Sequence, residues 1–112
     1  MITFNYFDGS NNHYKITETQ LIFDPMKPEF SSTGEYDGGV SQTIPISPLQ
    51  FQELQVVIMN AFNAVEAHVN NRSKGTCLLK MQEDNERASC ILEMNSLFKI
   101  DIEKVLKGLL AI

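Results

Sequence analysis

Alternating apolar and polar positions predict a β-hairpin at the start of the chain. Residues 2–7 and 13–23 are rich in β-branched and aromatic side chains, and residues 8–12 between them are turn-forming Asp, Gly, Ser and Asn. Since residues 21–23 form an unbroken apolar run, we expect the second strand to bend near residues 18–20.

The alternation stops between Asp24 and Gly34, where two prolines and a Ser/Thr/Gly cluster predict a loop inside the domain. A tight turn is expected at residues 37–39. A third strand follows from Val40 to Ile46. Pro45 indicates either that the end of this strand lies at an edge of the sheet or that its last hydrogen bond falls outside the ladder.

A helix-start signal follows at Ser47. Ser47 offers an N-cap hydroxyl, Pro48 suits the first helical position, and Gln50 completes a capping box. Apolar residues then recur every three or four positions and predict a helix of about 22 residues, from Pro48 to Val69. The predicted core seam of this helix comprises Phe51, Leu54, Ile58, Phe62 and Val65.

A second hairpin is predicted from residues 76–82 and 87–94, joined by a charged turn. If Gln82 lies opposite Arg87, Cys77 and Cys90 share the inward face as diagonal neighbours. Diagonal spacing is poor for a disulfide, so both cysteines are expected to be buried and reduced.

The chain is expected to end in a short helix, with Asp101 as its N-cap and Ala111 near its end. Residues 97–100 fit either a short strand or the first turn of this helix. The expected order is therefore three strands, a long helix, two strands and a short helix. This order predicts a single α+β domain over residues 1–112, in which a small antiparallel sheet of about five strands packs against one long helix.

The net charge of the chain and its distribution limit the kinds of partner that we expect. The chain has 14 acidic and 9 basic residues and a net charge of −5, and six acids but only two bases lie in residues 1–47. Nucleic acid is not an expected partner, because phosphate contacts need clustered Lys and Arg. No apolar run approaches the roughly 20 residues that span a bilayer, and no secretory segment opens the chain, so we expect a cytoplasmic protein without a membrane partner.

Motifs for catalysis, cofactors and metals are not apparent. Phosphate loops, dinucleotide-binding glycines, zinc-protease helices and calcium loops are absent from the sequence. No cofactor or metal is therefore expected. A binding function is favoured over catalysis, although a site assembled in space from the few His and Cys residues stays open.

The exterior of the long helix points to a protein partner. Between Leu49 and Val69 the only charged residues are Glu53 and Glu66, whereas a solvated helix usually carries many charges. Either the loop at residues 24–35 covers this surface or another chain does, and we expect a homodimer. The leading hypothesis is a non-enzymatic protein-binding or accessory module, regulatory, chaperone-like or inhibitor-like. Its expected partner-binding residues are Val56, Met59, Asn60, Asn63 and Ala67.

The alternative is a small enzyme or anion-binding domain. His68, Arg72 and Lys74 lie within seven residues of one another near the predicted end of the long helix. Cations there complement the helix dipole, and they could also bind a carboxylate or phosphate in a pocket.

Overall fold

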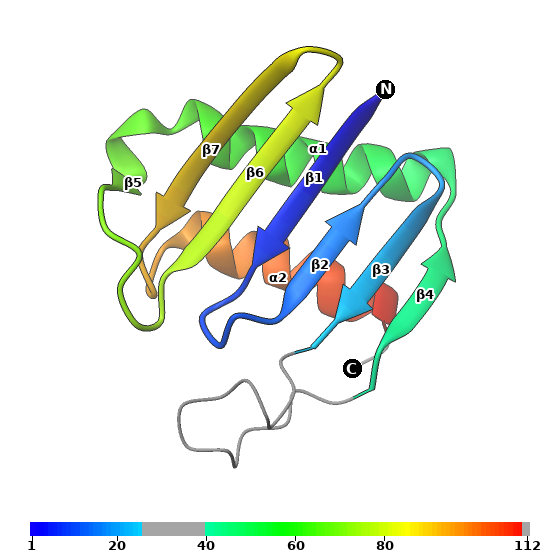
Figure 1. Ribbon diagram of the computed structural model, residues 1–112, viewed down its shortest axis with the longest axis horizontal. Coiled ribbons are helices and arrows are strands. Elements are labelled where there is room, and N and C mark those ends of the chain that lie inside the picture. Colours follow the sequence, from blue (N-terminus) through cyan, green and yellow to red (C-terminus); the bar gives the residue numbers. More distant parts are fainter. Residues whose placement is uncertain (26–39, 111–112) are drawn as a thin grey trace.

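The computed structural model describes residues 1–25 and 40–110 as one antiparallel sheet with two helices across one of its faces (Figure 1). Its strands are β1 (Ile2–Phe7), β2 (His13–Ile16), β3 (Gln20–Asp24), β4 (Gln42–Pro45), β5 (His68–Val69), β6 (Cys77–Glu83) and β7 (Glu86–Leu92). Its helices are α1 (Pro48–Asn63), the 3₁₀ turn η2 (Val65–Ala67) and α2 (Leu97–Leu110).

The seven strands follow the order β4-β3-β2-β1-β6-β7-β5. Strands β4 to β1 form a meander in reverse order, and β1 then pairs with β6 over the whole of its length, from Ile2 opposite Glu83 to Phe7 opposite Leu78. The predicted α+β class is confirmed, but the prediction of about five strands is wrong. Two of the seven strands, β3 and β5, were not foreseen as separate elements.

Strand β3 exists because the second predicted strand folds back instead of bending. The Thr17 hydroxyl accepts hydrogen bonds from the amides of Thr19 and Gln20, 3.4 and 3.1 Å away, and the Thr17 amide donates to the Gln20 carbonyl. A threonine side chain thus makes a turn where the sequence offers no Gly, Pro, Asn or Asp.

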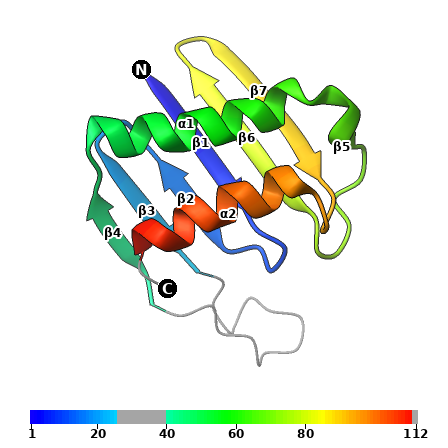
Figure 2. The same ribbon diagram turned by 180° about the vertical axis from the view of Figure 1, so that it is seen from behind.

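The core lies between the sheet and the two helices. Strand positions alternate strictly, so that Phe4 and Tyr6 of β1 are fully buried while Thr3 and Asn5 are half-buried on the other face. From α1, Leu54 and Ile58 are fully buried, and α2 contributes Ile102, Leu106 and Leu110. Figure 2 shows α1 and α2 side by side over the same face of the sheet.

Helix α1 begins as predicted and ends early. The Ser47 hydroxyl accepts from the Gln50 amide and the Gln50 side chain accepts from the Ser47 amide, which completes the capping box. The helix ends at Asn63, so the predicted end at Val69 is wrong, and Val65, placed in the core seam by the sequence, is 70% exposed.

The early end of α1 has two structural causes. The His68 ring Nε2 lies 2.8 Å from the Ala61 carbonyl and donates to it, which satisfies a carbonyl of the last helical turn. Residues 68–69 then extend as β5 and pair with Leu92 and Ile91 of β7. Residues 68–69 are therefore extended and not helical, because they hydrogen-bond to the edge of the sheet although the spacing of apolar residues fits a helix.

The second hairpin is confirmed in detail. Gln82 lies opposite Arg87, Cys77 opposite Leu92 and Leu79 opposite Cys90. Helix α2 starts at Leu97, and the Ser96 carbonyl accepts from the Ile100 amide, so residues 97–100 form its first turn and not a short strand. Asp101 therefore lies inside the helix and is not its N-cap.

Pro45 lies in the edge strand β4, as predicted. Most of the predicted loop at 24–34, the turn at 37–39 and the end of the last helix at Ala111 fall outside the described residues. Among the described helices, none is both long enough and apolar enough to cross a membrane.

Truncation of the α1 seam should destabilise the protein. Leu54 and Ile58 have no exposed surface, so Leu54→Ala or Ile58→Ala removes buried methyl groups and leaves a cavity. We expect a loss of about 2–5 kcal/mol in the free energy of unfolding, measured by chemical denaturation. The exposed Val65→Ala should change it by less than about 0.5 kcal/mol and serves as the control.

The two thiols should be unreactive in the folded protein. Cys77 and Cys90 are buried and free. Burial raises the pKa of the Cys77 thiol above its usual range and raises the pKa of the Cys90 thiol to about 11. Since the thiolate is the reactive form, both should label slowly with a thiol reagent near pH 8 and quickly after denaturation. Rapid labelling of either cysteine in the native state would contradict this.

Candidate functional site

Both described helices lie on one face of the sheet, and no described helix covers the opposite face, which is called the open face (Figure 1). Half-buried apolar side chains from neighbouring strands, Phe7, Leu78 and Ile91, form a row across this face. Beside the row lie the exposed cations Lys15 and Lys80, one on each side of Asn5. The open face thus combines a narrow apolar row with basic residues.

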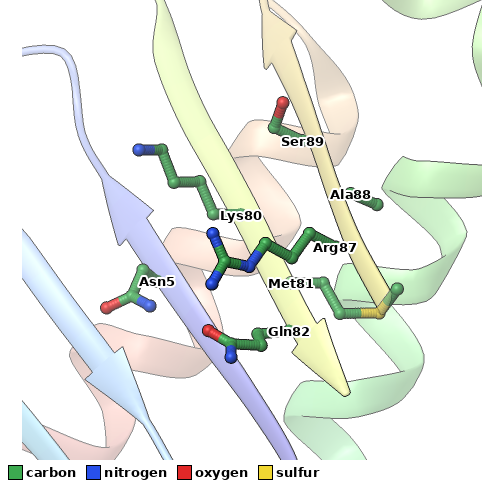
Figure 3. A pocket seen from close by; sticks show the side chains of 7 residues that line it. All are labelled: Asn5, Lys80, Met81, Gln82, Arg87, Ala88 and Ser89. Atoms are coloured by element: carbon green, nitrogen blue, oxygen red, sulfur yellow. The ribbon is translucent and has the colours of Figure 1, made fainter. Parts of the chain in front are cut away.

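A depression of about 470 Å³ lies over β1, β6 and β7 on the open face. Its lining comprises Asn5, Lys80, Met81, Gln82, Arg87, Ala88 and Ser89. Figure 3 shows the Arg87 side chain reaching from β7 across β6 toward Asn5 and Gln82. All the polar side chains of this lining except Asn5 are exposed, so they are available to a ligand.

Two aromatic rings lie near this depression among the described residues, those of Phe7 and His13, and they stack on each other. Phe7 stacks on His13 with ring centroids 4.5 Å apart and planes 5° from parallel, and the Lys80 ammonium lies 5.9 Å from the Phe7 centroid. The His13 ring Nε2 lies 2.7 Å from the side-chain oxygen of Asn5 and donates to it. Burial is the main cause that lowers the pKa of His13, so its ring is neutral near pH 7.

The sequence analysis did not predict this depression, although the part formed by β6 and β7 could have been predicted. The predicted hairpin register already places Lys80, Gln82, Arg87 and Ser89 on one face, opposite to the two cysteines. What the sequence does not reveal is that β1 pairs with β6 and brings Asn5 alongside, because nothing local specifies a pairing between residues so far apart in the chain.

The structure gives His68 and Arg72, two of the three predicted anion-binding residues, structural roles. His68 caps α1, as described above. Arg72 donates to both oxygens of Thr76 and, over 2.9 Å, to the Asp8 carbonyl, which ties the loop before β6 to the β1–β2 turn.

Lys74, the third of them, is exposed in the loop before β6. The depression that contains His68 is lined by Glu66 and Glu93 and not by Arg72 or Lys74. The structure therefore does not gather the three cations around this depression.

The expected partner-binding residues divide into two groups. Val56, Asn60 and Asn63 are exposed on α1. Met59 is half-buried against the core, and Ala67 lies in η2, beyond the end of the helix, where it also packs against the core. Met59 and Ala67 are therefore less accessible to a partner than the other three residues.

A polar cluster is buried between β1 and α2. The Tyr6 hydroxyl donates to Glu103 over 2.5 Å, and Glu103 is 3.0 Å from the Lys99 ammonium, whose side chain is only 12% exposed. Lys107 lies 3.9 Å from the second carboxylate oxygen of Glu103. Burial, followed by the neighbouring Cys77 and Glu103, raises the pKa of Tyr6 far above its usual range.

This cluster holds α2 against the sheet. Tyr6 has no exposed surface, and every buried side-chain nitrogen and oxygen of the described residues has a hydrogen-bond partner. A substrate has no access to the Tyr6 hydroxyl. Within the described ranges, no group of three or more His, Cys, Asp and Glu side chains is placed to hold a metal ion.

The Tyr6 hydroxyl should stabilise the fold in a pH-dependent way. Tyr6→Phe leaves Glu103 without one donor and should lower the free energy of unfolding by about 1–3 kcal/mol near pH 7. The folded state holds this phenol proton more tightly than the unfolded state, so its contribution is complete below about pH 10 and fades at higher pH. In denaturant titrations, wild type and Tyr6→Phe should therefore converge as the pH rises through about 10. A difference that stays constant with pH would exclude a tyrosine that is neutral and buried.

Comparisons with protein-family models, with curated proteins and with solved structures find no match to this chain. The candidate surfaces are therefore argued from their own chemistry.

Proposed function

We propose that this chain is a non-enzymatic protein-binding module that self-associates through the outer face of α1. The observation that carries this proposal is an uncharged stripe along that face. It consists of five exposed side chains at helical spacing, Leu49, Gln52, Val56, Asn60 and Asn63.

The stripe is unusual because of what it exposes and what it lacks. Leu49 is 77% and Val56 54% exposed, and both lie opposite the buried side of the helix. Within the 16 residues of α1 the only charge is Glu53, beside the stripe. Loss of charge together with exposed apolar side chains is typical of the centre of a protein interface.

A second copy of the chain fits this stripe better than an unrelated partner of opposite charge. Each copy has a net charge of −5, so two copies approach most easily through neutral surface. Asn60 and Asn63 carry both donors and acceptors, which lets an amide pair with its own symmetry mate across a two-fold axis.

The size of the stripe predicts a weak dimer. Sixteen residues make a helix about 24 Å long, and a single helix face of that length covers on the order of 250 Å². A stable interface needs about 800 Å² from each partner. Exposed Val65, Leu97 and Ile100 at the η2 end of the helical layer would enlarge the contact.

Most of the exposed large apolar side chains lie on the helical side of the molecule. Of the eight large apolar side chains that are exposed among the described residues, all but Met1 and Val40 lie in the helices, in η2 or in the β7–α2 connection. A depression that contains Val57 and Val105 lies between α1 and α2, with Glu53, Asp101 and Lys104 also in its lining. Burial of this layer in a dimer would remove most of that apolar surface from water.

A charge placed in the middle of the stripe should dissociate the dimer without unfolding the protein. Val56→Lys puts an ammonium into the proposed contact, where it would be desolvated without a partner. In sedimentation velocity from low micromolar to millimolar protein, wild type should shift from monomer to dimer and Val56→Lys should stay monomeric. Val56 is a better probe than Met59, because Met59 packs against the core.

The matched control is Thr43→Lys, which adds the same charge at an exposed position of β4, away from the helices. It should dimerise like wild type, and both variants should keep the melting temperature of wild type within a few degrees. A wild-type protein that is monomeric at millimolar concentration, or equal dissociation by both variants, would exclude self-association through α1.

A further inference from the structure

The open sheet face carries positive charge, whereas the chain as a whole is negatively charged. Lys15, Lys80 and Arg87 are exposed on this face, and none of them takes part in an ion pair with another described residue. The one acid on this face among the described strands is Asp24, in β3 next to His13. A chain with five more acids than bases thus places three cations on one surface without an ion-pair partner among the described residues.

The acids nearest in sequence do not neutralise these cations. Glu83 and Glu86 lie opposite each other at the end of the β6–β7 hairpin. Each is adjacent in sequence to a residue of the depression, Gln82 or Arg87, and successive strand residues point to opposite faces. Both carboxylates therefore belong to the other side of the sheet.

The strand register fixes the spacing of the donors around the depression. Lys80 lies between Asn5 and Ser89 in one row, and Gln82 lies opposite Arg87 in the next. Lys80 and Arg87 are diagonal neighbours, at a spacing of roughly 7 Å. Two cations at this distance can contact different oxygens of one bound oxyanion, and in Figure 3 the guanidinium lies over β6 on the same side of the sheet as Lys80.

The donor set fits a phosphate group. The Arg87 guanidinium offers a two-pronged contact to two oxygens, the Lys80 ammonium adds a point charge, and the Gln82 amide and Ser89 hydroxyl supply neutral donors. Two positive charges match the charge of about −1.5 to −2 that a phosphate monoester carries at pH 7. A carboxylate would neutralise only one of the two.

Nucleic acid is a poorer fit to the same face. Recognition of single strands relies on free aromatic faces on which bases stack. Phe7 and His13, the rings near the depression among the described residues, stack on each other, and the Lys80 ammonium lies over the Phe7 ring. The depression itself is lined by no aromatic residue.

We propose that the depression over β1, β6 and β7 is a binding site for the phosphate group of a small phosphate monoester, held by Arg87 and Lys80. This site lies on the face of the sheet away from α1 and is independent of the proposed self-association. Because its donors are exposed, binding is expected to be weak for inorganic phosphate, and the organic part of the ligand would gain further contact from the apolar row.

The site can be tested with inorganic phosphate as the probe, added at constant ionic strength while backbone amide shifts are followed by NMR. Saturable shifts are expected at residues 80–82 and 87–89 and at Asn5. Arg87→Gln should weaken binding roughly tenfold and Lys80→Gln by several-fold, since each removes a charge-assisted contact. Lys104→Gln removes the same charge from an exposed position of α2 and should bind like wild type.

Three outcomes would overturn the proposal. The first is a set of shifts that does not saturate, and the second is equal weakening by Lys104→Gln, which marks non-specific attraction. The third is tighter binding of a short single-stranded oligonucleotide than of phenyl phosphate, a small phosphate monoester, at the same residues. That result would identify the face as a nucleic-acid-binding surface.

Succinate, a dicarboxylate of the same charge, should bind more weakly than phosphate. All variants are compared only after their amide spectra show the dispersion of a folded protein.

Discussion

The pairing of β1 with β6 is the contact on which the rest of the molecule depends. It joins the meander of β2, β3 and β4 to the unit formed by β5, β6 and β7, and its partners lie more than 70 residues apart in the chain. Closing so long a loop costs conformational entropy before any contact is gained. A slip of one residue would exchange the two faces of β1 and bring Asn5 into the core in place of Phe4 and Tyr6.

The same pairing sets both surfaces of the sheet. On the covered side it places Tyr6 beside Leu79, under α2, where Glu103 accepts a hydrogen bond from the Tyr6 hydroxyl. On the open side it places Asn5 beside Lys80. Because both helices lie on one face, the molecule presents two unlike surfaces. One is a helical layer with exposed apolar side chains and an uncharged stripe on α1, and the other is a sheet face whose cations have no ion-pair partner among the described residues. The two proposals above use one surface each, so one copy could dimerise and hold a ligand at once.

Much of the fold could be predicted where the determining interactions are local. The capping box at Ser47 fixed the start of α1, and the alternation around Cys77 and Cys90 fixed the register of the second hairpin. The prediction failed where a tertiary contact overrode a local pattern. Residues 64–69 keep a helical spacing of apolar residues, yet His68 bonds back to Ala61 and the segment joins the edge of the sheet. The turn at Thr17 was missed because a hydroxyl replaces the usual turn residues.

The candidate sites were less predictable than the fold. Val56, Asn60 and Asn63 could be placed on the outer face of α1 from periodicity alone, whereas Met59 and Ala67 could not, because a flexible side chain and the early helix end return both to the core. From the sequence Arg72 was a candidate for anion binding, but its guanidinium donates hydrogen bonds to two backbone carbonyls from different loops. The depression on the open face needs three strands in register, and only two of them are neighbours in sequence.

The edges of the sheet, finally, limit how one molecule can join another. At one end β4 is only four residues long and contains Pro45, which has no amide proton to offer a further strand. At the other end β5 pairs with just two residues of β7, and the remaining outer edge of β7 begins with the charged Glu86 and Arg87. Continuation of the sheet from one molecule into the next, the geometry that leads to fibrils, is therefore disfavoured at both ends. Recognition is left to the two broad faces, whose side chains differ and can be selective.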